Sequence, residues 1–129
     1  MVKDLAHWLR AQLDEDERIA RAATLGPWVQ SGIGDYGWTV DFGRPGAGVE
    51  TADTEQGLAD ADFIAAHNPA RVLRETDAKR RVIEQYESIG DPPPGDFGPD
   101  LSRAELGRVL RLLALPYADR PGYREEWRP

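Results

Sequence analysis

The sequence predicts an α+β fold that is mainly helical, and three observations carry this prediction. Apolar residues recur at three- and four-residue steps through residues 3–24 and again after residue 56, which is the period of an amphipathic helix. Residues 28–51 are instead rich in glycine, aromatic and β-branched residues, a composition typical of short strands. The length of 129 residues suits a single domain.

The first element is expected to be a long N-terminal helix over residues 3–24. Leu5, Leu9 and Leu13 follow one another at four-residue steps, which places them on one face of a helix. Gly26 and Pro27 end the pattern, because glycine readily adopts the left-handed conformation after a helix and proline cannot continue one.

A small antiparallel hairpin or three-stranded sheet follows in the middle of the chain. Tyr36, Trp38, Val40 and Phe42 alternate with small or polar residues, which is the period of a half-buried strand. We expect strands near residues 27–31, 36–42 and 47–51. The turn between the last two is Gly43-Arg44-Pro45-Gly46.

A pair of consecutive helices comes next, over residues 56–67 and from Pro69 onward. Asn68 and Pro69 mark the break, because asparagine is a favoured N-cap and proline is favoured at the first helical position. Val72, Ile83 and Tyr86 are expected on the buried side of the second helix.

The last third of the chain predicts a linker, a helix and a docked tail. Three consecutive prolines within residues 90–100 favour an extended linker. Ser102 and Glu105 form a capping-box pattern, so a C-terminal helix is expected to begin at Arg103 and to end at Pro116. The tail over residues 117–129 contains three aromatic residues, and free tails rarely carry such large apolar side chains.

Charge and hydrophobic content exclude several classes of protein. The formal net charge is −7, and residues 26–67 alone hold seven acidic residues and one basic residue, so generic nucleic-acid binding is not expected. No apolar stretch is long enough to span a membrane, and charged Lys3 and Asp4 interrupt the position of a signal peptide, so we predict a cytoplasmic protein without a membrane partner. Only 27 residues are Leu, Ile, Val or Phe, about 21 %, which predicts a thin core.

No set of residues predicts catalysis. Cysteine is absent, which excludes thiol catalysis and thiolate zinc sites. The strongest candidate for a metal centre is His67 with Asp60 and Asp62, yet the sequence has no motif such as two histidines four residues apart. A histidine at the end of a helix also interacts favourably with the helix dipole. We therefore predict no catalytic residue, no metal and no cofactor.

Five stretches carry a resemblance to a known family. They are LDEDERIARAA over residues 13–23, Gly26-Pro27-Trp28, the segment ADFIAAHNPARVLRE over residues 61–75, AKRR over residues 78–81, and the ending LRLLALPYADRPGYREEWRP over residues 110–129. Together they resemble the actinobacterial domain of unknown function 6221, and more loosely some small proteins of actinophages and prophages. This resemblance implies no catalytic residue, cofactor or partner, because the family has no assigned activity.

The function expected from these observations is a non-catalytic protein–protein interaction or self-associating module, whose partner is an unidentified protein or a second copy in a homodimer. A thin core and a tail rich in aromatic residues both call for further surface to bury. The expected interaction surface consists of Trp28, Trp38, Tyr117, Tyr123 and Trp127. The alternatives are a small metal-dependent enzyme centred on His67, and an acidic decoy protein of phage or mobile-element origin.

Overall fold

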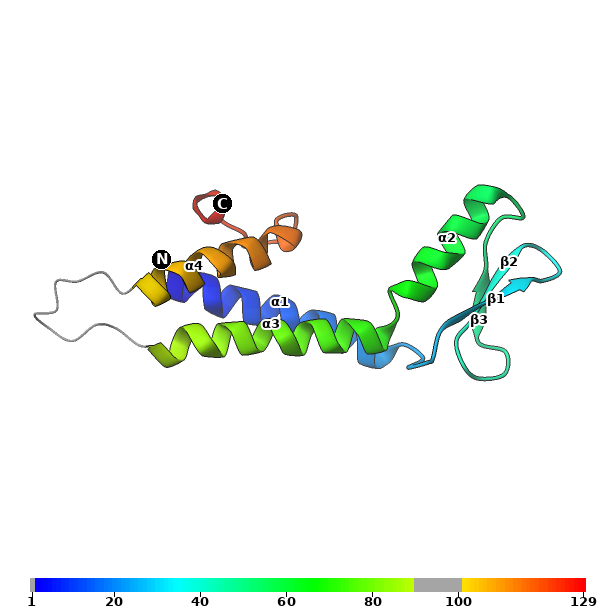
Figure 1. Ribbon diagram of the computed structural model, residues 1–129, viewed down its shortest axis with the longest axis horizontal. Coiled ribbons are helices and arrows are strands. Elements are labelled where there is room, and N and C mark those ends of the chain that lie inside the picture. Colours follow the sequence, from blue (N-terminus) through cyan, green and yellow to red (C-terminus); the bar gives the residue numbers. More distant parts are fainter. Residues whose placement is uncertain (1, 90–100) are drawn as a thin grey trace, which may run out of the picture. The chain divides into compact units, whose positions relative to one another are not determined.

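The computed structural model describes residues 2–89 and 101–129, and the described chain has the predicted α+β, mainly helical fold (Figure 1). The predicted linker, residues 90–100, lies outside the described residues. The elements, in chain order, are α1 (Val2–Ala22), β1 (Val29–Ile33), β2 (Trp38–Asp41), β3 (Gly48–Glu50), α2 (Glu55–Ala66), α3 (Pro69–Ile89), α4 (Leu101–Ala114) and the 3-10 turns η1 (Leu115–Tyr117) and η2 (Glu125–Trp127).

The chain divides into two compact units, and the single domain expected from the length stays a prediction. The helical unit comprises residues 1–15 and 76–129, of which 2–15, 76–89 and 101–129 are described. The sheet unit comprises residues 16–75, all of which are described. Helices α1 and α3 contribute residues to both units.

The helical unit has a hydrophobic core to which α1, α3, α4 and the tail contribute. Leu5, Leu9 and Leu13 of α1 are fully buried, as their four-residue spacing predicted. Ile83 of α3 and Leu110 of α4 are fully buried in the same cluster. The cluster is completed by Ala6, Tyr86, Ala114, Tyr117 and Trp127.

The sheet unit is a three-stranded antiparallel sheet in the order β1-β2-β3, with α2 packed against it (Figure 1). Val40 of the central strand pairs with Gln30 of β1 and with Val49 of β3. The side chains of Val40 and of Ala61 in α2 are fully buried. A bulge lies between Gln30 and Gly32, where Gly32 has φ = 98°, so β1 presents an irregular edge of the kind that discourages pairing with another strand.

Local capping explains where the helix pair is divided. The side chain of Asn68 accepts a hydrogen bond from the backbone N–H of Arg71 at 2.9 Å, so Asn68 caps α3 in front of Pro69, as predicted. Thr54 caps α2 in the same way by accepting from the N–H of Gly57 at 2.9 Å.

Predicted boundaries were wrong by one or two residues in several elements. Helix α1 ends at Ala22 rather than at residue 24, and β1 spans Val29–Ile33 rather than residues 27–31. The second strand excludes Tyr36 and Phe42, because the N–H of Gly34 donates to the carbonyl of Gly37 and draws Tyr36 into a turn, where it is 86 % exposed. Helix α4 begins at Leu101 rather than Arg103, so Ser102 lies inside its first turn. It ends at Ala114, just before η1, in which Pro116 lies, because proline cannot donate the helical hydrogen bond.

Gly57 is one of the two glycines in the sheet unit, with Gly37, at which an added side chain would come closest to another backbone segment. A Cβ added to Gly57 would lie 1.7 Å from the backbone carbonyl oxygen of Ala52, and Thr51 Oγ1 also donates to the Gly57 carbonyl at 2.6 Å. We expect Gly57→Ala to lower the free energy of unfolding by about 1–3 kcal/mol, because the backbone must move to admit the methyl group. Chemical denaturation measures this change, and an unchanged midpoint would show that the Ala52–Gly57 segment is not held as described.

Candidate functional site

The tail docks on the N-terminal helix of its own chain. Tyr117 is 5 % exposed and Trp127 is 3 % exposed, and the partly buried Tyr123 packs against the same core. The indole of Trp8 lies 5.6 Å from the Tyr123 ring and 5.4 Å from the Trp127 ring, between centroids. That these three tail residues form a binding surface stays a prediction. A partner would contact the buried Tyr117 and Trp127 only if the tail detached from α1.

Polar contacts to α1 fix the path of the tail. Trp8 Nε1 donates to the carbonyl oxygen of Pro121 at 3.0 Å, and a Cβ on Gly122 would lie 2.7 Å from the same nitrogen. Arg120 donates to the carbonyl oxygen of Gln12 at 3.3 Å. The aromatic residues of the tail predicted that it docks. The close approach of Gly122 to Trp8 could not be predicted, because the glycine is its only trace in the sequence.

The end of the tail carries a surface ion pair. Arg128 donates to Glu125 at 2.9 Å, and this hydrogen bond, with the charge of Arg128, lowers the pKa of the Glu125 carboxyl. Both groups are exposed, so the pair contributes little to stability.

Basic side chains gather in a hollow of about 560 Å³ in the helical unit, a feature that the sequence reasoning missed. Lys3, His7 and Arg10 line it from α1, and Arg103 lines it from α4. Their spacing of four and three residues on α1 is the signal that could have revealed one face. Arg10 pairs with Glu87 at 2.7 Å, and the Arg103 guanidinium lies 5.2 Å from the centre of the Tyr86 ring. These two arginines therefore bind α1 and α4 to α3.

Trp28 and Trp38, the other predicted interaction residues, are half-buried in the sheet unit. Trp28 stacks on Phe42 with ring centroids 4.0 Å apart and donates from Nε1 to the carbonyl oxygen of Thr24 at 2.7 Å. Trp38 donates from Nε1 to the carbonyl oxygen of Thr54 at 3.1 Å. Each indole is thus held by its own unit, and no ring contact joins the two within residues 16–75.

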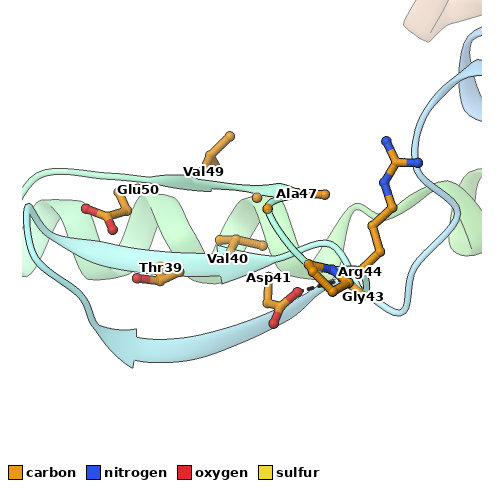
Figure 2. Close-up of a pocket in the computed structure, with 11 residues that line it drawn as sticks. Thr39, Val40, Asp41, Gly43, Arg44, Ala47, Val49 and Glu50 are labelled. Atoms are coloured by element: carbon orange, nitrogen blue, oxygen red, sulfur yellow. Dashed lines mark hydrogen bonds between the residues drawn. The ribbon is translucent and has the colours of Figure 1, made fainter.

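The hairpin of β2 and β3 encloses an open hollow of about 660 Å³ (Figure 2). Its carboxylates support turns: Asp41 accepts from the N–H of Gly43 at 2.8 Å, and Glu50 accepts from the N–H of Tyr36 at 2.9 Å. Figure 2 shows the side chain of Arg44 extending away from both carboxylates. The hollow therefore presents turn-forming groups rather than polar groups that converge on a common point.

The sheet unit leaves many large apolar side chains in water. Seven of them are exposed, whereas its buried hydrophobic residues are Val40 and two alanines, Ala20 and Ala61. The exposed residues are Ile19, Leu25, Val29, Ile33, Tyr36, Val49 and Phe63. In the described part of the helical unit the proportion is reversed, with two large apolar residues exposed and ten hydrophobic residues buried.

The residues of the hypothetical metal centre are engaged elsewhere. His67 caps the end of α2, where Nδ1 lies 2.8 Å from the carbonyl oxygen of Phe63. Asp60 accepts from Gln56 at 3.0 Å, and Asp62 accepts from Gln30 at 3.3 Å. Within residues 2–89 and 101–129, no group of three or more histidine, aspartate or glutamate side chains is placed to hold a metal ion.

Comparison with known proteins identifies a family for the chain. The model of a family of unknown function, DUF6221, matches residues 2–129. No curated protein and no solved structure matches the chain. Among the described helices, none is long and apolar enough to cross a membrane.

Proposed function

The chain belongs to the DUF6221 family, and we propose that it is a non-catalytic protein-interaction module whose contact surface lies on the sheet unit. The observation that carries the proposal is the contrast between seven exposed large apolar side chains and three buried hydrophobic residues in residues 16–75. Exposed apolar surface is unfavourable in water, and a surplus of it in one unit is typical of surfaces that bind other proteins.

The charge of the sheet unit favours a basic partner over a second copy. Residues 16–75 hold ten acidic and five basic residues, a net charge of −5. Like charges repel when two copies of one surface approach, whereas a basic surface is attracted and is guided to the correct site. The homodimer is therefore the second arrangement to test.

The two alternatives draw less support. A metal-dependent enzyme centred on His67 would need further ligands beside the imidazole, and among the described residues no group of three or more histidine, aspartate or glutamate side chains is placed to hold a metal ion. An acidic decoy of phage origin would fit the negative charge, but it would not use the exposed apolar side chains. Binding by such a decoy would weaken steeply with salt, whereas apolar contacts persist.

Site-specific photo-crosslinking in cells of the source organism tests the proposal. A photoreactive phenylalanine analogue replaces Phe63, which is 64 % exposed in the sheet unit. The control places the same analogue at Leu112, which is 56 % exposed on α4 in the helical unit. We expect one defined adduct from position 63 and none from position 112.

The mass of the adduct identifies the partner. A second protein joined to the chain supports the proposal, and an adduct of twice the chain mass supports the homodimer form of it. Absence of an adduct at position 63, or the same adducts from both positions, would contradict an interaction surface on the sheet unit.

A further inference from the structure

The outer edge of β3 has the features of a site for an extended protein segment. We propose that the protein partner adds a short strand to this edge, antiparallel to β3, and that the added strand alternates basic with apolar side chains. This inference rests on the proposed function and names the chemistry that the partner presents. Among the described residues β3 pairs with β2 alone, so it forms one edge of the sheet.

The hydrogen bonds between β2 and β3 determine which backbone groups face the outer edge. The N–H of Thr51 donates to the carbonyl oxygen of Trp38 at 2.8 Å, so Thr51 faces β2. Backbone groups alternate in direction along an antiparallel strand, so Val49 faces β2 as well. Gly48 and Glu50 therefore turn their N–H and carbonyl groups outward, where an added strand can bind them.

The opposite edge of the sheet is less suited to pairing. β1 carries a bulge between Gln30 and Gly32, whereas β3 pairs with β2 in continuous register. All three residues of β3 are exposed, and none is a lysine or a proline, the residues that commonly protect an edge from further pairing. β3 is therefore the edge to which a strand can add.

The two faces of β3 differ, and this difference predicts the pattern of the added strand. Val49 pairs with the fully buried Val40 and shares its face of the sheet, and Val49 itself is 39 % exposed. Glu50 lies on the other face, because neighbouring side chains of a strand alternate. An added strand would thus place apolar side chains beside Val49 and basic side chains beside Glu50.

The segment that contains β3 has an excess of carboxylates that no ion pair offsets. Residues 26–67 hold one basic residue, Arg44, and seven acidic ones, none of which forms an ion pair with a described basic side chain. The acidic residues are Asp35, Asp41, Glu50, Asp53, Glu55, Asp60 and Asp62. This surplus attracts a basic strand and repels an acidic one, including β3 of a second copy.

Two of these carboxylates lie close to the edge. Asp41 and Glu50 both line the hollow of about 660 Å³ in the hairpin (Figure 2). Asp41 accepts its backbone hydrogen bond through Oδ1 and Glu50 through Oε2, so the second oxygen of each can accept from a cationic side chain. Asp41 pairs with Gly48 in the register, and because Gly48 has no side chain, a basic side chain of the added strand can reach across it.

Two peptides of opposite charge test the inference. The probe is acetyl-Lys-Val-Lys-Val-Lys-amide, and its counterpart carries glutamate in place of each lysine. Each is titrated into the full-length 15N-labelled protein at pH 7 and low salt, while amide hydrogen exchange is recorded. At a lysine-peptide concentration of ten times the dissociation constant, we expect exchange at Gly48 and Glu50 to slow by about tenfold, because only the free protein exchanges. The glutamate peptide should bind more weakly by about tenfold, because like charges repel.

Two N-methylated isomers of the lysine peptide test the backbone pairing itself. In antiparallel pairing the lysines opposite Gly48 and Glu50 turn their backbone N–H groups toward β3, and the valines turn theirs away from it. Methylation of the backbone nitrogens of the lysines should therefore abolish the protection. Methylation of the backbone nitrogens of the valines should leave it intact.

A double variant tests the contribution of charge. Asp41→Asn with Glu50→Gln keeps the oxygens that accept from backbone N–H groups and removes both charges. It should weaken binding of the lysine peptide by about fivefold, the effect of two exposed ion pairs.

Equal protection by the two methylated isomers, equal binding of the two charged peptides, or undiminished binding by the folded double variant would overturn the inference. The crosslink from position 63 is independent of these titrations. An adduct there without protection of Gly48 and Glu50 would therefore refute strand addition and leave the interaction surface standing.

Discussion

Replacement of Trp127 by alanine is expected to lower the free energy of unfolding by about 3–5 kcal/mol, as large aromatic truncations in cores do. The Trp127 ring is 3 % exposed and lies against Trp8 and Tyr123, with centroids 5.4 and 5.8 Å away. Its removal opens a cavity beneath the tail and deletes the contacts that hold the tail on α1. Urea denaturation followed by circular dichroism measures the loss.

Trp127→Phe is the matched control. The indole nitrogen of Trp127 is buried and makes no hydrogen bond to any described residue, so a phenyl ring loses contact area but no polar partner. We expect it to cost clearly less than the alanine variant. A Trp127→Ala protein as stable as the wild type would show that the tail is not part of the core.

Replacement of Leu9 by alanine is expected to lower the free energy of unfolding by about 2–5 kcal/mol, the range for leucine truncation in a close-packed core. Leu9 is fully buried in the cluster that α1, α3, α4 and the tail share. The same chemical change at Leu25, which is 58 % exposed in the sheet unit, should change the stability by less than about 0.5 kcal/mol.

The comparison of Leu9 with Leu25 tests whether buried apolar residues of the helical unit stabilise the fold while exposed apolar residues of the sheet unit do not. Denaturation of both variants under the same conditions gives the two free energies. A loss at Leu25 as large as that at Leu9 would mean that the exposed apolar residues of the sheet unit stabilise the folded chain itself, and the argument for a partner would fail.

The sequence predicted those parts of the fold that local chemistry determines. The step of four residues from Leu5 to Leu13 identified the buried face of α1, and Asn68 with Pro69 located the start of α3. These signals are local, because each depends on residues within one or two helical turns. The aromatic content of the tail also predicted its docking correctly.

Apart from the docking of the tail, contacts between distant residues could not be predicted from the sequence. Ile19 continues the apolar pattern of α1 yet is 52 % exposed, because periodicity identifies a helix face but not whether another element covers it. Tyr36 continues the apolar alternation of β2 in the sequence, yet it lies in a turn. Its backbone N–H donates to the carboxylate of Glu50, fourteen residues away. A pocket near Trp28 and His67 likewise depends on three segments that meet only after folding.

The claim that the sheet unit binds a protein is tested most directly by crosslinking combined with a surface substitution. The photoreactive residue is placed at Ile19, and Phe63 is left intact or changed to alanine. Phe63→Ala should leave the free energy of unfolding within about 0.5 kcal/mol of the parent, as for other surface substitutions. The account predicts a defined adduct from position 19 that Phe63→Ala strongly reduces. An adduct that persists undiminished in the folded Phe63→Ala protein would contradict the account.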